Sequence, residues 1–285
     1  MQRLAIFLDG TWNDEGSKTN VHSVYESVAP RDLDGNAQHA YYDSGVGTGK
    51  FDKIRGGALG RGLSKNVRDA YSWILEHEYE EGDRLYVFGF SRGAYTARSL
   101  GGLIAACGLA RRGAPFKTDY LYERYQERKE SALPIYKLAY IRDVSHERLL
   151  TEEETTLLTH SRRIQIHMMA VWDTVGALGV PWTGMPLIGR DKYYFHNPNL
   201  SKIYDNAFQA LAVDEHRKAY KPTLWTLFVP GTDDRTVPPA PPMPPLRNVE
   251  QRWFIGAHAD VGGGYAKGQL ALPPRSWLPG RPRRR

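Results

Sequence analysis

The sequence lacks the features that would indicate an extracellular or membrane-spanning protein. Its 285 residues include a single cysteine, Cys107, which excludes a disulfide within the chain and fits a reducing compartment. No apolar run reaches about 18 residues, so we expect no membrane-spanning helix. The apolar stretch 3–8 is short and ends at Asp9, so we expect no signal peptide. The protein is therefore expected to be cytoplasmic, or exported by a route that needs no signal peptide.

The excess of positive charge does not indicate a nucleic-acid-binding protein. The net charge is +6, but five arginines and no acid lie in the last eleven residues, and without those arginines the charge falls to +1. We therefore expect a basic, disordered tail over residues 269–285 and no nucleic-acid partner. The glycine-rich stretch 43–49 is not followed by the Gly-Lys-Ser/Thr of a phosphate-binding loop. No nucleotide, other cofactor or metal is expected.

Apolar segments that alternate with helical patterns predict one doubly wound α/β domain over residues 1–268. Between about residues 111 and 161 the chain is polar and predicts a helical insertion over the sheet. The oligomeric state is left open. Strands are expected at 3–8, 40–42, 85–88, 164–171, 224–229 and 252–256, and helices after Ser64, over 94–106 and over 206–220.

The pentapeptide Gly89-Phe90-Ser91-Arg92-Gly93 predicts a nucleophile elbow. It follows an apolar strand and precedes a helix rich in small residues. In a G-x-S-x-G turn the serine backbone is strained and its hydroxyl is presented to a substrate, and the glycines are needed because a side chain would collide there. An ordinary turn with an incidental serine is the alternative, and the strand–turn–helix context favours the nucleophile.

A catalytic serine needs a histidine to accept its proton and a carboxylate to orient that histidine. His258 lies in a glycine-rich loop directly after a strand, which predicts an exposed side chain and the best placement among nine histidines. Asp173 ends a strand and is preferred as the acid over Asp214, which falls in the helix expected at 206–220. The order Ser91, Asp173, His258 is that of α/β-hydrolases, so the predicted fold is α/β-hydrolase-like, with a mostly parallel sheet flanked by helices.

Two backbone N–H groups are candidates for the oxyanion hole, which stabilises the negative charge of the tetrahedral intermediate. One belongs to Arg92, directly after the nucleophile, and the other to Thr11, in the loop after the first strand. The Arg92 side chain is expected to pair with a substrate phosphate or with Asp43. Asp260 is too close to His258 in the sequence to orient its ring, and we expect it to brace the loop.

Two other functions remain open. Asp9, Asp43, Asp173 and Asp260 all lie at predicted strand ends, where they would suit a metal-assisted hydrolase. The same fold without a working catalytic triad would serve as a binding module.

An ordered set of motifs gives a more specific prediction. The motifs are LDGTWN, YYDSGVGTG, GDRLYVFGFSRGAYTAR, VWDTVGA, ALAVDE and WFIGAHADVGGGY. They resemble the DUF2235 family, the Tle1-like phospholipase catalytic domain of type VI secretion effectors, over about residues 1–268, and the sequence after Tyr265 looks unrelated to the family.

The resemblance implies an α/β-hydrolase fold and a serine esterase that acts on phospholipid acyl esters. It assigns Ser91 as the nucleophile, His258 as the base and Asp173 as the acid. It further implies transient contact with a membrane surface and export through type VI secretion.

Overall fold

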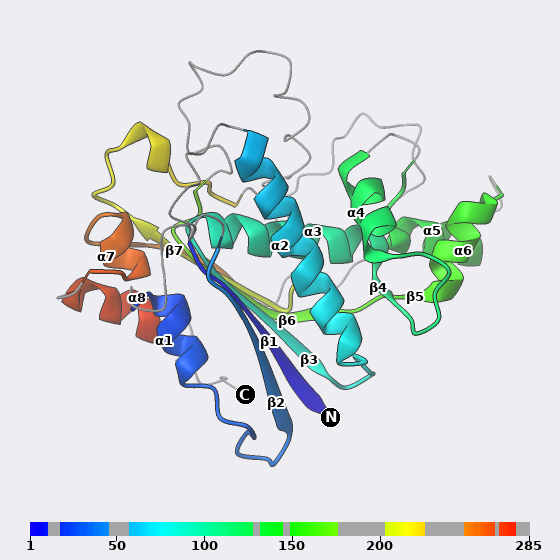
Figure 1. The fold of residues 1–285 in the computed structure, drawn as a ribbon, viewed down its shortest axis with the longest axis horizontal. Helices are drawn as coiled ribbons and strands as arrows, with labels where there is room; N and C mark the ends of the chain where they lie inside the picture. Colours follow the sequence, from blue (N-terminus) through cyan, green and yellow to red (C-terminus); the bar gives the residue numbers. More distant parts are fainter. Residues whose placement is uncertain are drawn as a thin grey trace.

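A six-stranded parallel sheet forms the centre of the protein (Figure 1). The structure is a computed structural model that describes residues 1–10, 18–45, 57–127, 132–144, 149–175, 203–225, 248–265 and 268–277. Every neighbouring pair of strands is parallel, so the carboxyl ends of all six strands lie at one edge. In spatial order the strands are β2 (Ala37–Asp43), β1 (Gln2–Leu8), β3 (Arg84–Phe90), β6 (Ile166–Trp172), β7 (Asn206–Ala212) and β8 (Asn248–Phe254).

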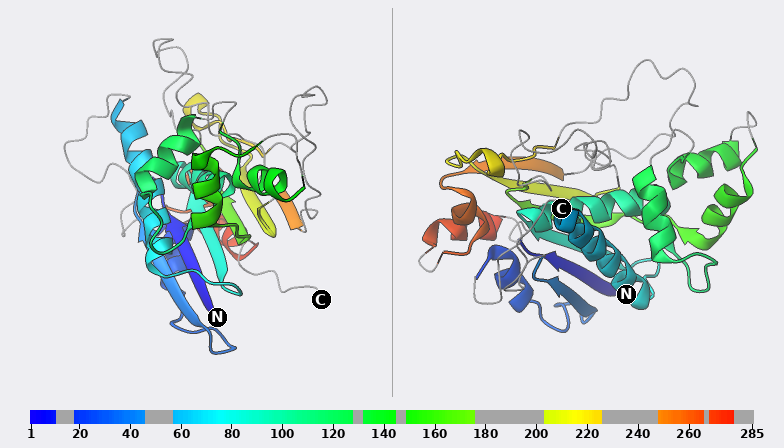
Figure 2. Two further views of the ribbon diagram at one scale, coloured as in Figure 1. Left: turned by 90° about the vertical axis from the view of Figure 1, so that its right-hand side faces the viewer. Right: turned by 45° about the horizontal axis from the view of Figure 1, so that its top comes forward.

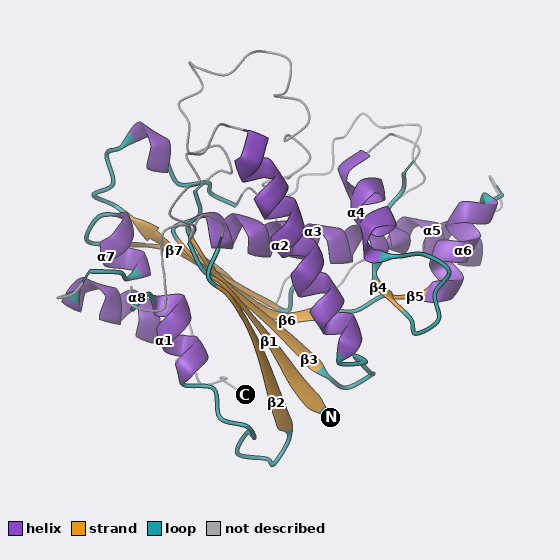
Figure 3. Ribbon diagram, viewed as in Figure 1, coloured by secondary structure: helices purple, strands orange, loops and turns teal. Residues whose placement is uncertain are grey.

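Helices cover both faces of this sheet, which explains why its central strands are buried on both sides (Figure 3). Along β1, Leu4 and Ile6 face one layer of helices, whereas Phe7 faces the other. The first layer contains α2 (Gly57–Glu76) and α3 (Arg92–Cys107), and the second contains α1 (Asn20–Glu26), α7 (His258–Gly262) and α8 (Leu272–Trp277). Helix α2 begins earlier than the start expected after Ser64. The α/β-hydrolase-like fold predicted from the sequence is confirmed.

A helical insertion lies between α3 and β6 and extends from one end of the molecule (Figure 2). It consists of α4 (Thr118–Glu127), α5 (Ile135–Val144) and α6 (Glu152–His160), with a short antiparallel pair formed by β4 (Leu109–Ala110) and β5 (Ser161–Arg162). One leucine from each helix, Leu121, Leu138 and Leu157, belongs to the same hydrophobic core as α2 and α3. The insertion therefore packs as part of the domain. No helix in the described ranges is long and apolar enough to cross a membrane.

The prediction of a helix over residues 206–220 is wrong. Residues Asn206–Ala212 form β7, between β6 and β8, and only Lys218–Tyr220 form a single 3₁₀ turn. Six of the seven β7 residues are buried, because the strand has neighbours on both sides and helices on both faces. Such a strand shows no alternation of apolar and polar residues, so its pattern resembles that of a helix. Of the strand expected at 224–229, residues 224 and 225 are not in a strand and the others lie outside the described residues.

The prediction of a disordered tail over residues 269–285 is wrong for residues 269–277. Residues Gln269–Ala271 form a 3₁₀ turn and Leu272–Trp277 form α8. The Trp277 ring packs against Phe208 and Phe254, with centroid separations of 5.9 and 5.4 Å. The arginines of this segment predict a solvated tail. The residues before position 278, however, include Trp277, whose ring covers Phe208 of β7 and Phe254 of β8. Residues 278–285 lie outside the described residues.

Candidate active site

Ser91 occupies the sharp turn between β3 and α3. Its backbone has φ 57° and ψ −120°, a conformation that a residue with a side chain rarely adopts. A Cβ atom added at Gly93 would lie 2.0 Å from the Leu8 carbonyl oxygen, and one added at Gly89 would lie 2.6 Å from Ala94 Cα. Both contacts are far shorter than van der Waals distance. The turn therefore requires glycine on both sides of Ser91, as a nucleophile elbow does.

Asp173 and His258 form a buried hydrogen-bonded pair. Asp173 Oδ2 lies 2.6 Å from His258 Nδ1, and Asp173 Oδ1 accepts the Ala212 N–H at 3.0 Å. Asp173 is fully buried, directly after β6, and its φ of 34° is also positive. Because a carboxylate accepts, Nδ1 of His258 carries the proton and donates it. This tautomer leaves Nε2 as the ring atom able to accept a proton.

His258 is buried, not exposed as its glycine-rich loop predicted. Only 5% of its surface is accessible, and it is the first residue of α7. Its ring contacts the Phe90 ring at a centroid distance of 4.7 Å and the Tyr220 ring at 4.9 Å. These aromatic neighbours, one beside Ser91 and one from the segment after β7, restrict the movement of the imidazole.

Ser91, Asp173 and His258 lie at the same edge of the sheet. Phe90 and Trp172 are register partners in β3 and β6, so Ser91 and Asp173 follow at matching positions. The Ser91 N–H donates to the Trp172 carbonyl at 3.1 Å. Within the described ranges no hydrogen bond joins Ser91 Oγ to His258. Catalytic hydrogen bonds of this kind are often long without substrate and shorten when it binds.

The first turn of α3 is suited to stabilise an oxyanion. Arg92 is the first residue of this helix, so its N–H has no acceptor inside the helix, and the helix dipole favours negative charge there. Thr11, the second donor expected from the sequence, lies outside the described residues. The close approach of Gly93 to Leu8 and Asp9 nevertheless brings the end of β1 beside the start of α3.

The two aspartates at the ends of β1 and β2 hold loop residues. Asp9 is 1% exposed and accepts hydrogen bonds from the Gly10 N–H at 2.7 Å, from the Tyr42 hydroxyl at 2.9 Å and from the Thr19 hydroxyl. Asp9 therefore braces the start of the loop after β1.

Asp43 accepts from the Gly45 N–H at 2.7 Å and from Asn66 Nδ2 at 3.0 Å, and burial raises the pKa of its carboxyl group. In the part of the chain that the structure describes, no ion pair joins Asp43 to Arg92. Burial lowers the pKa of the half-buried Arg92 guanidinium.

Three carboxylates hold three consecutive backbone N–H groups at 256–258. Asp214, Asp260 and Glu215 accept these N–H groups at 2.7, 3.0 and 3.2 Å, respectively, in chain order. Asp214 thus contacts the loop before His258, and Asp260 caps α7. Sequence reasoning missed Glu215, although it stands directly beside Asp214 in the ALAVDE motif.

The four aspartates considered as metal ligands do not converge. Within the described ranges, no group of three or more histidine, cysteine, aspartate or glutamate side chains is arranged to hold a metal ion. Asp9, Asp43, Asp173 and Asp260 each accept hydrogen bonds from protein donors. The geometry therefore gives no support to a metal centre built from these residues.

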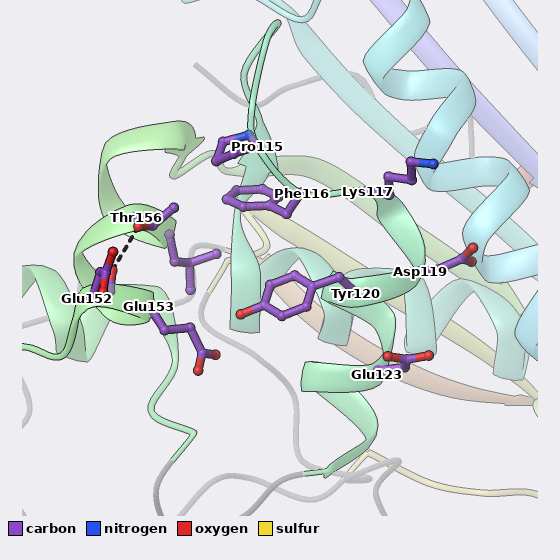
Figure 4. Close-up of a pocket in the computed structure, with 10 residues that line it drawn as sticks. Pro115, Phe116, Lys117, Asp119, Tyr120, Glu123, Glu152, Glu153 and Thr156 are labelled. Carbon is purple, nitrogen blue, oxygen red and sulfur yellow. Dashed lines mark hydrogen bonds between the residues drawn. The ribbon is translucent and has the colours of Figure 1, made fainter.

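A pocket of about 680 Å³ lies in the helical insertion (Figure 4). It is lined by residues of two segments, 115–123 and 152–157, and none of Ser91, Asp173 and His258 borders it. Four carboxylates and one lysine line it, so its charge does not suit an anionic substrate group. The edge of the sheet where Ser91, Asp173 and His258 lie is therefore the candidate substrate site.

The parallel sheet, with Ser91 delivered by β3, Asp173 by β6 and His258 after β8, defines an α/β-hydrolase-like domain. Residues 2–280 match the family described as "T6SS, Phospholipase effector Tle1-like, catalytic domain". The match covers nearly the whole chain, so the chain belongs to this family. It also extends past residue 268, where the sequence alone suggested that the family resemblance ends.

Individual relatives are distant and longer. "Uncharacterized protein YEL023C" of Saccharomyces cerevisiae is 24% identical over 242 residues, which cover 79% of this chain and 33% of the yeast protein. An uncharacterized protein from Pseudomonas aeruginosa is 15% identical with a TM-score of 0.52, over 97% of this chain and 45% of that protein. A Tle1 effector solved bound to the VgrG spike of a type VI secretion system is 17% identical with a TM-score of 0.41, over 95% of this chain and 52% of the effector. The chain thus spans about a third to a half of the length of these relatives.

Proposed function

We propose that this chain is a serine hydrolase that cleaves an acyl ester of a phospholipid through an acyl-enzyme, with Ser91 as nucleophile, His258 as general base and Asp173 as its orienting acid. The observation that carries the proposal is the 2.6 Å Asp173–His258 hydrogen bond at the sheet edge where the strained Ser91 stands. Membership of the Tle1-like family supports a phospholipid as the substrate.

The first half of the reaction forms the acyl-enzyme. Ser91 Oγ attacks the carbonyl carbon of the ester while His258 Nε2 takes the hydroxyl proton. Asp173 stays ionised and stabilises the resulting imidazolium through Nδ1. The N–H of Arg92 donates to the oxyanion, and the N–H of Thr11 is proposed as the second donor. The bond from carbon to the alcohol oxygen then breaks, and His258 returns the proton to the departing lysophospholipid.

The second half releases the fatty acid. Water attacks the acyl carbon, and His258 accepts a proton from this water while Asp173 again holds Nδ1. The tetrahedral intermediate collapses, the bond from carbon to Ser91 Oγ breaks, and the proton on His258 returns to the serine. Every step uses the same three side chains, so loss of any one of them is expected to cost several powers of ten in rate.

The Arg92 side chain supplies a positive charge for the phosphate of the substrate. Its guanidinium is half-buried at the first position of α3 and has no carboxylate partner within the described ranges. A phosphodiester is an anion that matches the fork of an arginine. We also propose transient contact with a membrane surface, and export as part of a type VI secretion effector, on the basis of the family description.

A lipid assay with matched serine variants tests the proposal. Wild-type protein is expected to react with a fluorophosphonate probe and to release fatty acid from phospholipid vesicles, with or without a metal chelator. Ser91→Ala is expected to lose both activities, with kcat lower by about 10³-fold or more. Ser99→Ala is the control, because Ser99 lies in the same helix and its hydroxyl donates to the Tyr95 carbonyl at 2.8 Å.

Two results would overturn the proposal. Hydrolysis that persists in Ser91→Ala but stops with chelator would favour a metal-assisted enzyme. Folded wild-type protein that neither reacts with the probe nor cleaves any lipid would indicate a binding module.

A further inference from the structure

We propose that Glu215, Arg217 and Tyr220 form a bracket that positions His258 for proton transfer. This inference rests on the proposed role of His258 as the general base. The three residues follow β7 and contact His258 at two places, its backbone N–H and its ring. They are positioning residues, because they act on the reaction through His258. We refer to them as the histidine bracket.

Glu215 anchors the backbone of His258. Its side chain is 2% exposed, and its Oε2 accepts the His258 N–H at 3.2 Å. The same carboxylate accepts from Arg217 Nε at 2.8 Å, from an Arg217 terminal nitrogen at 2.6 Å and from the Arg217 backbone N–H at 2.8 Å. The bidentate pair with Arg217 lowers the pKa of Glu215 to about 2, so the carboxylate stays ionised at neutral pH.

Arg217 connects this backbone anchor to a second contact on the imidazole. Its guanidinium carbon lies 3.9 Å from the centroid of the Tyr220 ring, in stacking range. The Tyr220 ring meets the His258 ring edge to face, at a centroid distance of 4.9 Å and an interplanar angle of 62°. Arg217 is therefore the common link, since it fixes both the carboxylate that holds the His258 backbone and the ring that contacts the His258 side chain.

His258 needs this support because of its place in the chain. It begins α7, which has only five residues, and the N–H groups of a first helical turn have no acceptor within the helix. Asp214 and Asp260 hold the two preceding N–H groups. Of the three carboxylates, Glu215 contacts His258 itself and is also linked through Arg217 to a ring that touches the imidazole. A displacement of about 1 Å at a catalytic group can cost about 100-fold in rate.

The test compares variants of the bracket with a matched carboxylate–arginine pair in the full chain. The bracket variants are Glu215→Ala, Glu215→Gln, Arg217→Ala and Arg217→Lys. The control is Glu250→Ala, because Glu250 Oε1 lies 2.6 Å from a terminal nitrogen of Arg252, which is likewise two residues further on. Active sites are counted with a fluorophosphonate probe, so that kcat refers to folded enzyme. The ¹H NMR signal of the His258 Nδ1 proton is recorded without substrate.

We expect Glu215→Ala and Arg217→Ala to lower kcat by about 100-fold while KM for a phospholipid changes by less than about threefold. The Nδ1 proton signal is expected to broaden or shift, because the ring no longer rests in one position against Asp173. Glu215→Gln keeps an acceptor for the His258 N–H and is expected to recover about tenfold. Arg217→Lys keeps the charge without the planar fork and is expected to recover less. Glu250→Ala is expected to match wild type.

Several outcomes would overturn the inference. If both alanine variants keep kcat within threefold of wild type while His258→Ala is inactive, the bracket is wrong and the proposed function stands. If His258→Ala remains active, the proposed function fails and the bracket fails with it. If the alanine variants do not fold, Glu215→Gln and Arg217→Lys decide, and kcat equal to that of Glu250→Ala in both would refute the bracket.

Discussion

Replacing Asp173 with asparagine tests the proposed proton path directly. The amide oxygen of the new side chain can take the place of Asp173 Oδ1 and still accept the Ala212 N–H, now at 3.0 Å. This orientation turns the amide nitrogen toward His258 Nδ1, in the place of the carboxylate oxygen that now lies 2.6 Å away. An amide nitrogen donates, so Nδ1 must accept, and the ring proton moves to Nε2. The histidine then presents a donor where a base is needed.

The size of the effect follows from the wrong tautomer alone. Asparagine in place of the orienting aspartate in such a triad lowers kcat by about 10⁴-fold. At about 1.4 kcal/mol for each factor of ten, this is about 5 kcal/mol of transition-state stabilisation. Asparagine matches aspartate in volume and keeps the Ala212 hydrogen bond, so the free energy of unfolding is expected to change far less than the activation free energy.

Fatty-acid release and the rate of fluorophosphonate labelling are the measurements, both on folded protein at pH 7. Asp205→Asn is the matched control, because Asp205 Oδ2 lies 3.4 Å from His167 Nδ1 in another aspartate–histidine pair. Asp205 directly precedes β7, at the opposite edge of the sheet from Ser91. This control is expected to keep wild-type activity. If kcat of Asp173→Asn stays within tenfold of wild type, Asp173 does not set the tautomer, and equal losses in both variants would point to a general effect on stability.

Three further predictions concern stability. Gly93→Ala is expected to lower the free energy of unfolding in urea by about 3 kcal/mol or more, because its Cβ would lie 2.0 Å from the Leu8 carbonyl oxygen; an unchanged urea midpoint would refute the close contact. The folded-state pKa of Glu215 is lowered to about 2 from 4.5, so the stabilisation it gives is present above pH 4.5 and lost as the pH falls toward 2. Between pH 5 and pH 2, the free energy of unfolding of wild type in urea titrations should therefore fall by about 2 kcal/mol more than that of Glu215→Gln. This amount is smaller than the full pKa shift implies because Arg217 is half exposed and solvent screens the pair. If the free energies of wild type and variant change equally with pH, the pairing is contradicted. Trp277→Ala is expected to cost about 2 kcal/mol by the same assay, and no loss would mean that α8 contributes nothing to the core.

The residues of the proposed triad could be found from local sequence patterns. Ser91, Asp173 and His258 each follow an apolar segment and precede or enter a glycine-containing turn. Parallel strands bring such positions to one edge of the sheet, whatever the distance between them in the chain. The pairing of Asp173 with His258 across 85 residues follows from that rule once the strands are known.

The remaining features depend on contacts that no local pattern records. The sequence predicts a helix over 206–220 because the strand at 206–212 is buried on both faces and shows no alternation of apolar and polar residues. No local pattern distinguishes Glu215 from the charged residues beside it. Only the approach of α7, 43 residues further on, shows that Glu215 holds the His258 N–H. The burial of His258 has the same origin, since Tyr220 comes from a separate segment.

The positive φ angles at Ser91 and Asp173 have a consequence for the history of the domain. Each of these backbone conformations would suit glycine better, at a cost of about 1–3 kcal/mol per site for a residue that bears a side chain. Selection for thermal stability alone would favour glycine at both positions, and the protein would become more stable while it lost the proposed hydrolase activity. Under the proposed function, the Ser91 hydroxyl and the Asp173 carboxylate are retained only where selection for hydrolysis continues. A relative with glycine at both positions is therefore expected to keep the fold without the catalytic activity.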